Sequence, residues 1–161
     1  MTYTDELLAR AQAFAEGFEP GPPAHGAKVA VVACMDARLD PWRIFDLKDG
    51  EAHVIRNAGG VITDDEIRSI AISQRLLGST EVILVHHTGC GMLTFTDDDF
   101  RHDIRKDTKT VPEWEAGTFS DLDDSVRKSI AQIKESRFIP HTDSVRGFVY
   151  ELETGRLREV T

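Results

Sequence analysis

Cysteine, aspartate and arginine alternate in the segment Cys34-Met35-Asp36-Ala37-Arg38, directly after a run of small and branched apolar residues. In an extended chain, residues at positions i, i+2 and i+4 point to one face. We therefore expect the side chains of Cys34, Asp36 and Arg38 to lie on the same side of the chain. A thiolate can hold a metal ion, a neighbouring carboxylate can orient a water there, and a guanidinium can orient the carboxylate.

A second reactive segment is His87-Thr88-Gly89-Cys90, in which an imidazole and a thiol lie three residues apart across a turn. Gly89 and Gly91 flank the cysteine and allow the backbone to bend sharply. Together with Cys34, this segment supplies two thiols and one imidazole. Three protein ligands with an open fourth position are typical of catalytic zinc. Two isolated cysteines can also be small core side chains, and that alternative stays open.

His86 and His87 are adjacent, and successive residues of a strand point to opposite faces. We expect His87 to ligate the metal because the turn brings it nearer to Cys90. His86 is then interpreted as a core or interface residue. Asp36 and Arg38 also have two interpretations beside a metal. They form an ion pair that manages the bound water, or Asp36 closes the site as a fourth ligand.

Strands and helices alternate through the body of the chain, which predicts a mainly parallel sheet with helices on both faces. The carboxyl ends of parallel strands share one edge, where ligands bind in open sheets. Cys34, His87 and Cys90 all fall at that edge. The expected strands are 27–34, 52–60, 81–87 and an antiparallel pair within 144–160, and the expected helices begin near Pro41 and span 63–78, 94–108 and 121–138.

The N-terminus has a different organisation. Residues 4–18 have the apolar spacing of an amphipathic helix, and 19–26 form a linker rich in proline and glycine. We therefore expect residues 1–26 to form an N-terminal arm and residues 27–161 to form a single α/β zinc-binding catalytic domain. The arm packs either on its own domain or on a partner subunit.

Composition narrows the class of protein. The chain has 161 residues, 40% hydrophobic and 29% charged, which is ordinary for a soluble globular domain. A net charge of −9 argues against nucleic acid as a partner and favours small-molecule substrates. The sequence has no apolar run that could span a membrane and no signal-peptide pattern, so we expect a cytoplasmic protein without membrane contact.

A glycine pair, Gly59–Gly60, follows the second expected strand. Its backbone N–H groups could face a bound anion, which makes both glycines candidates for substrate binding. A simple tight turn explains the pair equally well.

The segments CMDARLDP, RNAGG and HHTGCGM, in this order, resemble the β-class carbonic anhydrases, with the closest similarity to their small prokaryotic branch. The resemblance extends from about Ala27 to Val149. It implies that Cys34, His87 and Cys90 bind Zn²⁺, and that Asp36 and Arg38 form the dyad beside it. It also implies a homodimer or a multiple of dimers, in which the N-terminal arm packs on the neighbouring subunit.

Three functions are compatible with this pattern. The first is zinc-dependent, reversible hydration of CO₂ to bicarbonate and a proton. The second is hydrolysis of carbonyl sulfide or carbon disulfide, which proteins similar to this family perform with the same ligands. The third is a non-catalytic zinc-binding protein in which Asp36 closes the site, although an intact Asp36–Arg38 pair argues against it. A redox role is weaker because the sequence has no C-x-x-C motif.

Overall fold

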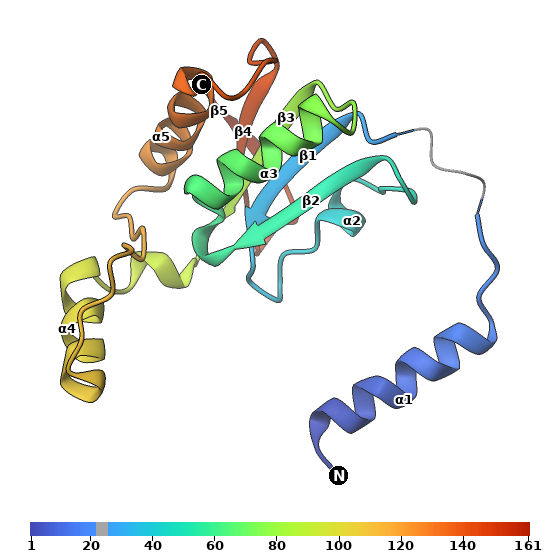
Figure 1. The fold of residues 1–161 in the computed structure, drawn as a ribbon, viewed down its shortest axis with the longest axis horizontal. Coiled ribbons are helices and arrows are strands. Elements are labelled where there is room, and N and C mark those ends of the chain that lie inside the picture. Colours follow the sequence, from blue (N-terminus) through green and yellow to red (C-terminus); the bar gives the residue numbers. More distant parts are fainter. Residues whose placement is uncertain (22–25) are drawn as a thin grey trace.

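A computed structural model describes residues 1–21 and 26–161; residues 22–25, within the linker expected at 19–26, lie outside the described part. Helices and strands follow the predicted order along the chain (Figure 1). The helices are α1 (Tyr3–Glu16), α2 (Pro41–Ile44), α3 (Asp64–Arg75), α4 (Asp97–Thr108) and α5 (Leu122–Glu135), with short 3₁₀ turns η1 (Ala58–Gly60) and η2 (Gly91–Leu93). The strands are β1 (Val29–Cys34), β2 (Ala52–Asn57), β3 (Glu81–His87), β4 (Val145–Tyr150) and β5 (Leu157–Val160).

The strands form one sheet in the order β2-β1-β3-β4-β5. The first three pairings, β1 with β2, β1 with β3 and β3 with β4, are parallel, and β5 pairs with β4 in the antiparallel direction. This confirms the predicted fold class, a mainly parallel α/β sheet with an antiparallel C-terminal strand. Since β1 is central and almost wholly buried, its Val-Ala-rich sequence matches that of a strand covered on both faces.

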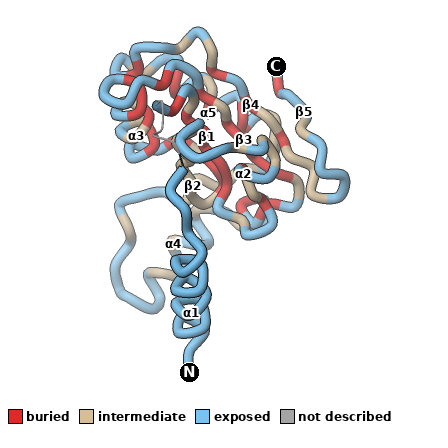
Figure 2. The backbone as a smooth tube through the Cα atoms, turned by 90° about the vertical axis from the view of Figure 1, so that its right-hand side faces the viewer, coloured by how far each residue is buried: buried red, intermediate tan, exposed pale blue. Residues whose placement is uncertain are grey.

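Two apolar cores lie on opposite faces of the sheet. On one face, Ile70 of α3 and Ile133 of α5 pack with Val32 and Leu84. On the other, Val31 and the ligand-bearing end of β1 pack with residues around α2 and the segment after β3. In Figure 2 the buried residues concentrate in the sheet and in α3 and α5. The cores thus fix the strand ends that carry the reactive residues.

The helix α1 is set apart from this body. Thr2 caps it, with Asp5 completing a capping box, so the helix is locally well formed. None of its residues is buried in the described chain, although its apolar stripe includes Leu7, Leu8 and Phe14. Figure 1 shows it projecting below the sheet, on the opposite side from α4.

Two predicted helix starts are confirmed, whereas one strand and one helix end earlier than expected. Asp40 caps α2 with Pro41 at its first position, and Thr63 forms the predicted capping box of α3. The strand expected over 52–60 was wrong beyond Asn57, because Gly59 adopts a positive φ and turns the chain. The helix expected to Gly78 ends at Arg75, so Leu77 leaves the predicted apolar face and is half exposed.

Three further expected segments were two to four residues too long, namely 27–34, 94–108 and 121–138. The helix expected from Thr94 begins only after Thr96, whose side chain caps α4. Among the described residues, no helix has the length and apolarity needed to cross a membrane.

Candidate metal centre

Two strand ends and one loop bring two thiols and an imidazole together. Cys34 is the last residue of β1, His87 is the last of β3, and Cys90 precedes η2. Their ligand atoms all lie within 4.8 Å of one another, and all three residues are buried. The parallel pairing of β1 with β3 places these strand ends side by side, as expected from the sequence.

The geometry of this group fits a tetrahedral metal ion. The Sγ atoms of Cys34 and Cys90 lie 3.9 Å apart. Two sulfurs each 2.3 Å from a tetrahedral zinc would be about 3.8 Å apart. The Nδ1 atom of His87 lies 2.8 Å from the carbonyl oxygen of Thr88, to which it can donate, leaving the lone pair on Nε2. That Nε2 atom is buried without a hydrogen-bond partner among the described residues, as a metal-directed atom should be.

The two thiols have opposite tendencies to ionise. The hydrogen bond from Cys90 lowers the pKa of Cys34 against the cost of burial, and His87 adds to this effect. The thiolate at Cys34 and burial together raise the pKa of Cys90 well above its usual range. One thiolate is therefore readily formed without a metal. A cation would be needed to hold the second, which is what a metal ion supplies on binding.

His86 faces the other side of the sheet, as the alternation along β3 predicts. Its Nε2 lies 3.1 Å from the carbonyl oxygen of Gly60, and its Nδ1 lies 3.0 Å from the hydroxyl of Ser125. The ring also stacks on Phe119. Burial lowers the pKa of His86 to about 4, so the ring is neutral at pH 7. The prediction of a core histidine is consistent with this placement.

Asp36 and Arg38 reach the site through a turn, so the expectation of an extended segment was wrong. The strand β1 ends at Cys34, and the amide of Leu39 donates to the carbonyl of Asp36. The carboxylate of Asp36 also accepts from the backbone amide of Arg38, at 2.9 Å. An aspartate that bonds to an amide two residues on is a turn former, which explains why the strand stops here.

The two side chains form a bidentate ion pair. Arg38 Nε lies 3.0 Å from Asp36 Oδ1, and Nη2 lies 2.7 Å from Oδ2. These bonds hold the pKa of Asp36 far below its usual range. The Oδ2 atom lies 3.7 Å from Nε2 of His87, so the carboxylate is directed toward the metal group. Arg38 also donates to the carbonyl of Gly89 at 3.2 Å and thereby ties the two reactive segments together.

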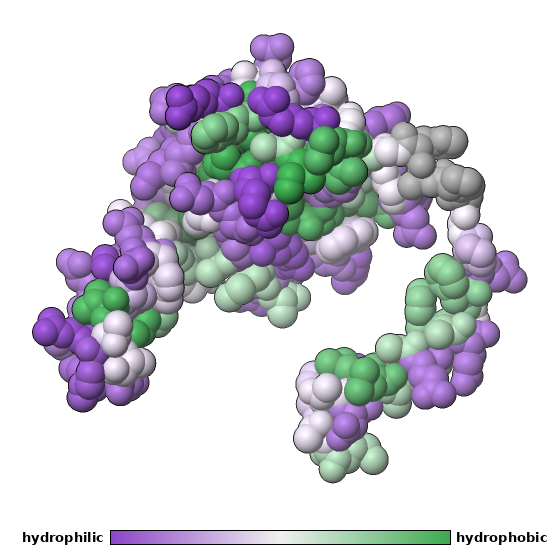
Figure 3. Space-filling view, viewed as in Figure 1, coloured by the Kyte–Doolittle hydropathy of each residue, from purple (hydrophilic) through white to green (hydrophobic). Residues whose placement is uncertain are grey.

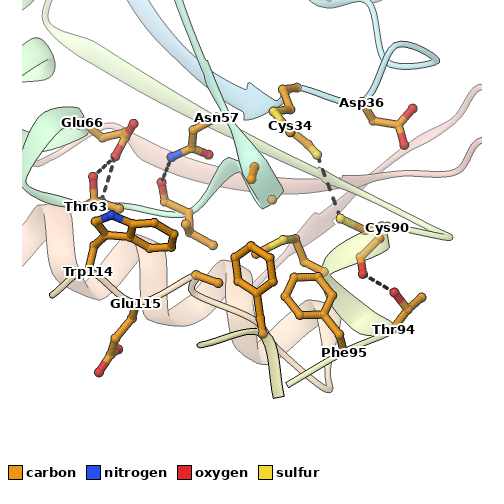
Figure 4. A pocket seen from close by; sticks show the side chains of 18 residues that line it. Cys34, Asp36, Asn57, Thr63, Glu66, Cys90, Thr94, Phe95, Trp114 and Glu115 are labelled. Carbon is orange, nitrogen blue, oxygen red and sulfur yellow. Dashed lines mark hydrogen bonds between the residues drawn. The ribbon is translucent and has the colours of Figure 1, made fainter. Parts of the chain in front are cut away.

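A mainly apolar pocket of about 730 Å³ opens onto these residues. Figure 4 shows Cys34, Asp36 and Cys90 along one side, with Phe95 and Trp114 on other parts of the wall. The aromatic wall comes from Phe95, Phe100 and Trp114, which the sequence analysis did not identify. Phe95 precedes α4, Phe100 lies in its first turn and Trp114 follows it, and only the fold brings these three positions to the pocket.

The two glycines of the predicted anion-binding turn have different positions. Gly59 lines the pocket at a φ of +87°. Gly60, at a φ of +67°, packs against the backbone of β1 and offers its carbonyl to His86. Substrate contact stays a prediction for both glycines, and the tight-turn interpretation describes the geometry of Gly60.

Sequence reasoning also missed Arg56, on β2. Its guanidinium donates to the carbonyl oxygens of Cys34, Asp36 and Leu39 at 2.7–3.0 Å. The arginine is visible within the RNAGG segment, but no local pattern indicates that it turns toward the neighbouring strand.

Fold and site together define a class of protein: a mainly parallel α/β protein with two thiols and an imidazole placed to hold a metal ion at the carboxyl edge of its sheet. Residues 29–157 match the family model described as "Carbonic anhydrase". The whole chain is 53% identical to "Beta-carbonic anhydrase 1" of Mycobacterium tuberculosis and covers 99% of that protein. The chain therefore belongs to the β-carbonic anhydrase family.

Two further comparisons agree with this assignment. The crystal structure of carbonic anhydrase from Streptococcus mutans matches with a TM-score of 0.90 at 39% identity, over 100% of this chain and 99% of that one. A "Carbon disulfide hydrolase" of Acidianus sp. is 30% identical, over 98% of this chain and 88% of that protein. The resemblance seen in the sequence motifs is thus confirmed for the family.

The packing of Gly60 is testable by substitution. A Cβ at this position would lie 2.9 Å from the amide nitrogen of Cys34 and 3.2 Å from the carbonyl oxygen of Val85. Gly78→Ala is the matched control, because Gly78 also has a positive φ but has no atom within 4 Å of the added Cβ. We expect Gly60→Ala to lower the free energy of unfolding by about 1–3 kcal/mol more than Gly78→Ala. Equal losses in urea unfolding would contradict the close approach.

Proposed function

We propose that this protein catalyses the reversible hydration of CO₂ to bicarbonate and a proton with a zinc ion held by Cys34, His87 and Cys90. The observation that carries this proposal is the juxtaposition of those three buried side chains with the Asp36–Arg38 pair at the wall of an apolar pocket. The full-length similarity to a mycobacterial β-carbonic anhydrase supports the same reaction.

When bound, the zinc ion would supply a Lewis acid that lowers the pKa of water and so provides an oxygen nucleophile near neutral pH. Asp36 is the catalytic residue that would accept a hydrogen bond from this nucleophile and orient it. Arg38 keeps the carboxylate ionised and fixes both of its oxygens. Since Asp36 is engaged by Arg38, it is held back from acting as a fourth ligand, which argues against a non-catalytic zinc protein.

The pocket suits a small, uncharged substrate. Its wall is formed mainly by apolar side chains such as Met92, Phe95 and Trp114, which favour CO₂ over water. The carboxylate of Asp36 lies at the same wall and disfavours retention of the anionic product. Gly59 also lines the pocket and would contribute backbone polarity there.

The similarity to a carbon disulfide hydrolase makes hydrolysis of carbon disulfide or carbonyl sulfide the second candidate. Its support is weaker, because that relative is 30% identical whereas the mycobacterial carbonic anhydrase is 53% identical. Stopped-flow assays of the same zinc-loaded preparation with CO₂ and with carbon disulfide separate the two. Turnover of carbon disulfide alone would overturn the proposed reaction.

Loss of one ligand tests the metal assignment. In Cys90→Ser we expect the zinc content to fall well below that of the unaltered chain and CO₂ hydration to fall with it, because serine does not provide a thiolate. Circular dichroism checks that the fold persists, and elemental analysis measures the zinc. His102→Ala alters an exposed histidine of α4 and is expected to leave both quantities unchanged. Full zinc content and activity in Cys90→Ser would contradict the assignment.

The role of Asp36 is tested by Asp36→Asn, which keeps the shape of the side chain but removes its charge. We expect kcat/KM for CO₂ to fall by about 10²-fold, within the range for losing a positioned proton acceptor, while the zinc content is retained. The control is Asp65→Asn, because Asp65 forms a comparable but exposed ion pair with Arg68. The proposed role is wrong if the two variants are equally active.

We infer that the domain formed by residues 27–161 assembles as a dimer or a multiple of dimers through the arm formed by residues 1–26. In α1, the exposed apolar residues lie along one stripe, and none of them is buried against the described part of the chain. Figure 3 shows these apolar side chains open to solvent, and a second apolar patch on the body. We also propose a cytoplasmic location. Cys34 and Cys90 form no disulfide, which suits a reducing compartment.

Charged substitutions on α1 test this assembly. We expect the double variant Leu8→Lys/Phe14→Lys to shift the protein to a smaller species in sedimentation velocity, because two charges would have to be buried at the interface. The double variant Ala9→Lys/Ala13→Lys places the same charges on the opposite side of the helix and is expected to keep the native mass. An unchanged mass in both variants would exclude the arm as the interface.

A further inference from the structure

The guanidinium of Arg56 bonds to the loop from Cys34 to Leu39, which carries the predicted metal ligand Cys34 and the carboxylate of Asp36. Arg56 Nε lies 3.0 Å from the carbonyl oxygen of Cys34. Its Nη2 lies 2.8 Å from that oxygen, 2.8 Å from the carbonyl of Asp36 and 2.7 Å from the carbonyl of Leu39. A single partly buried side chain thus satisfies three backbone acceptors within a six-residue loop.

The pairing of β2 with β1 fixes the position of Arg56 relative to the loop. Arg56 lies opposite Ala33 in the parallel register of β1 with β2, one residue before the strand end at Cys34. Its bonding partners are carbonyls, and no carboxylate makes a hydrogen bond to it among those found in the described chain. The charged guanidinium therefore stabilises the backbone conformation of the loop from Cys34 to Leu39.

The same loop depends on a second arginine. Arg38 holds the carboxylate of Asp36, whereas Arg56 on β2 holds the backbone carbonyl of the same residue. Without Arg56, the carbonyls of Cys34, Asp36 and Leu39 would lose these bonds, Asp36 would keep only the bond from the Leu39 amide, and the turn could relax. Asp36 would then lose its fixed distance to the ligand group, even with the bidentate pair intact.

We propose that Arg56 is a positioning residue for the reaction, because its bonds to the carbonyls of Cys34, Asp36 and Leu39 set where Asp36 lies relative to the metal ligands. The inference rests on the proposed function, since the value of this placement is to align the oxygen nucleophile. A lysine would lack the Nε donor to the Cys34 carbonyl, and its ammonium would lie one bond short of the Nη2 position that contacts all three carbonyls. Charge alone is therefore insufficient.

The experiment compares Arg56→Ala and Arg56→Lys with Arg75→Ala. Arg75 is the matched control because its guanidinium also donates to a backbone carbonyl, that of Phe138, but far from the pocket. Zinc content and circular dichroism establish that each variant is folded and loaded. We expect kcat per bound zinc to fall by about 10²-fold in both Arg56 variants, since small misplacements of reacting groups have effects of this size. KM should change little, and Arg75→Ala should match the unaltered protein.

Two readouts respond to placement rather than to overall stability. The visible absorption spectrum of the Co²⁺-substituted protein should change in Arg56→Ala, because it reports the geometry around the metal. Millimolar guanidinium chloride should restore part of kcat in Arg56→Ala but not in Arg56→Lys, where the space is filled; equal sodium chloride is the control. Arg56→Lys with native kcat, or an Arg56→Ala loss that disappears when rates are expressed per bound zinc, would overturn the proposal.

A measurement without metal separates this inference from the proposed reaction. In the metal-free protein, hydrogen–deuterium exchange of the amides of Met35 and Leu39 should accelerate in Arg56→Ala and not in Arg75→Ala. The Met35 amide ties the loop to the Asn57 carbonyl of β2, and the Leu39 amide closes the turn on the Asp36 carbonyl. If the unaltered protein hydrates no CO₂ but exchange and the Co²⁺ spectrum change as expected, the reaction is wrong and the positioning holds. Unchanged exchange would overturn the positioning by itself.

Discussion

The parallel pairing of β1 with β3 is the constraint on which the site depends. Val29 lies opposite Glu81, and the register continues to Ala33 opposite Val85, so both strands end at the same edge of the sheet. The turn that follows β3 then brings Cys90 next to Cys34 and His87. Because the central strands are buried on both faces by separate apolar cores, this register resists slippage. The rigidity of the ligand group follows from the core.

Burial of the ligand group makes the ionisation of both thiols unfavourable unless a cation lies beside them. Two thiols 3.9 Å apart can both ionise only beside a cation, and the pKa directions of Cys34 and Cys90 express this repulsion. The orientation of His87 through the Thr88 carbonyl leaves one nitrogen free for the same cation. The site therefore gains most from a divalent ion with an affinity for sulfur and imidazole.

The pocket around the ligand group combines rigid and exposed parts. Its floor is made from strand ends, the η1 turn and a loop tied down by arginine side chains, whereas its mouth includes the partly exposed Phe100 and Trp114 near α4. A rigid floor suits chemistry that requires aligned groups, and an open apolar mouth suits rapid exchange of a small neutral molecule. The exposed α1 places further apolar surface outside the body, in keeping with assembly of more than one copy.

The sequence by itself determined the order of elements, the fold class, the two reactive segments and the choice of His87 over His86, because these follow from periodicity, residue type and alternation along a strand. Only the tertiary structure decided that Asp36 arrives through a turn, that Gly60 packs on the β1 backbone, and that aromatic residues in and near α4 line the pocket. It also revealed Arg56 beneath the loop. These features depend on contacts between segments distant in the chain, whose side-chain directions no local pattern specifies.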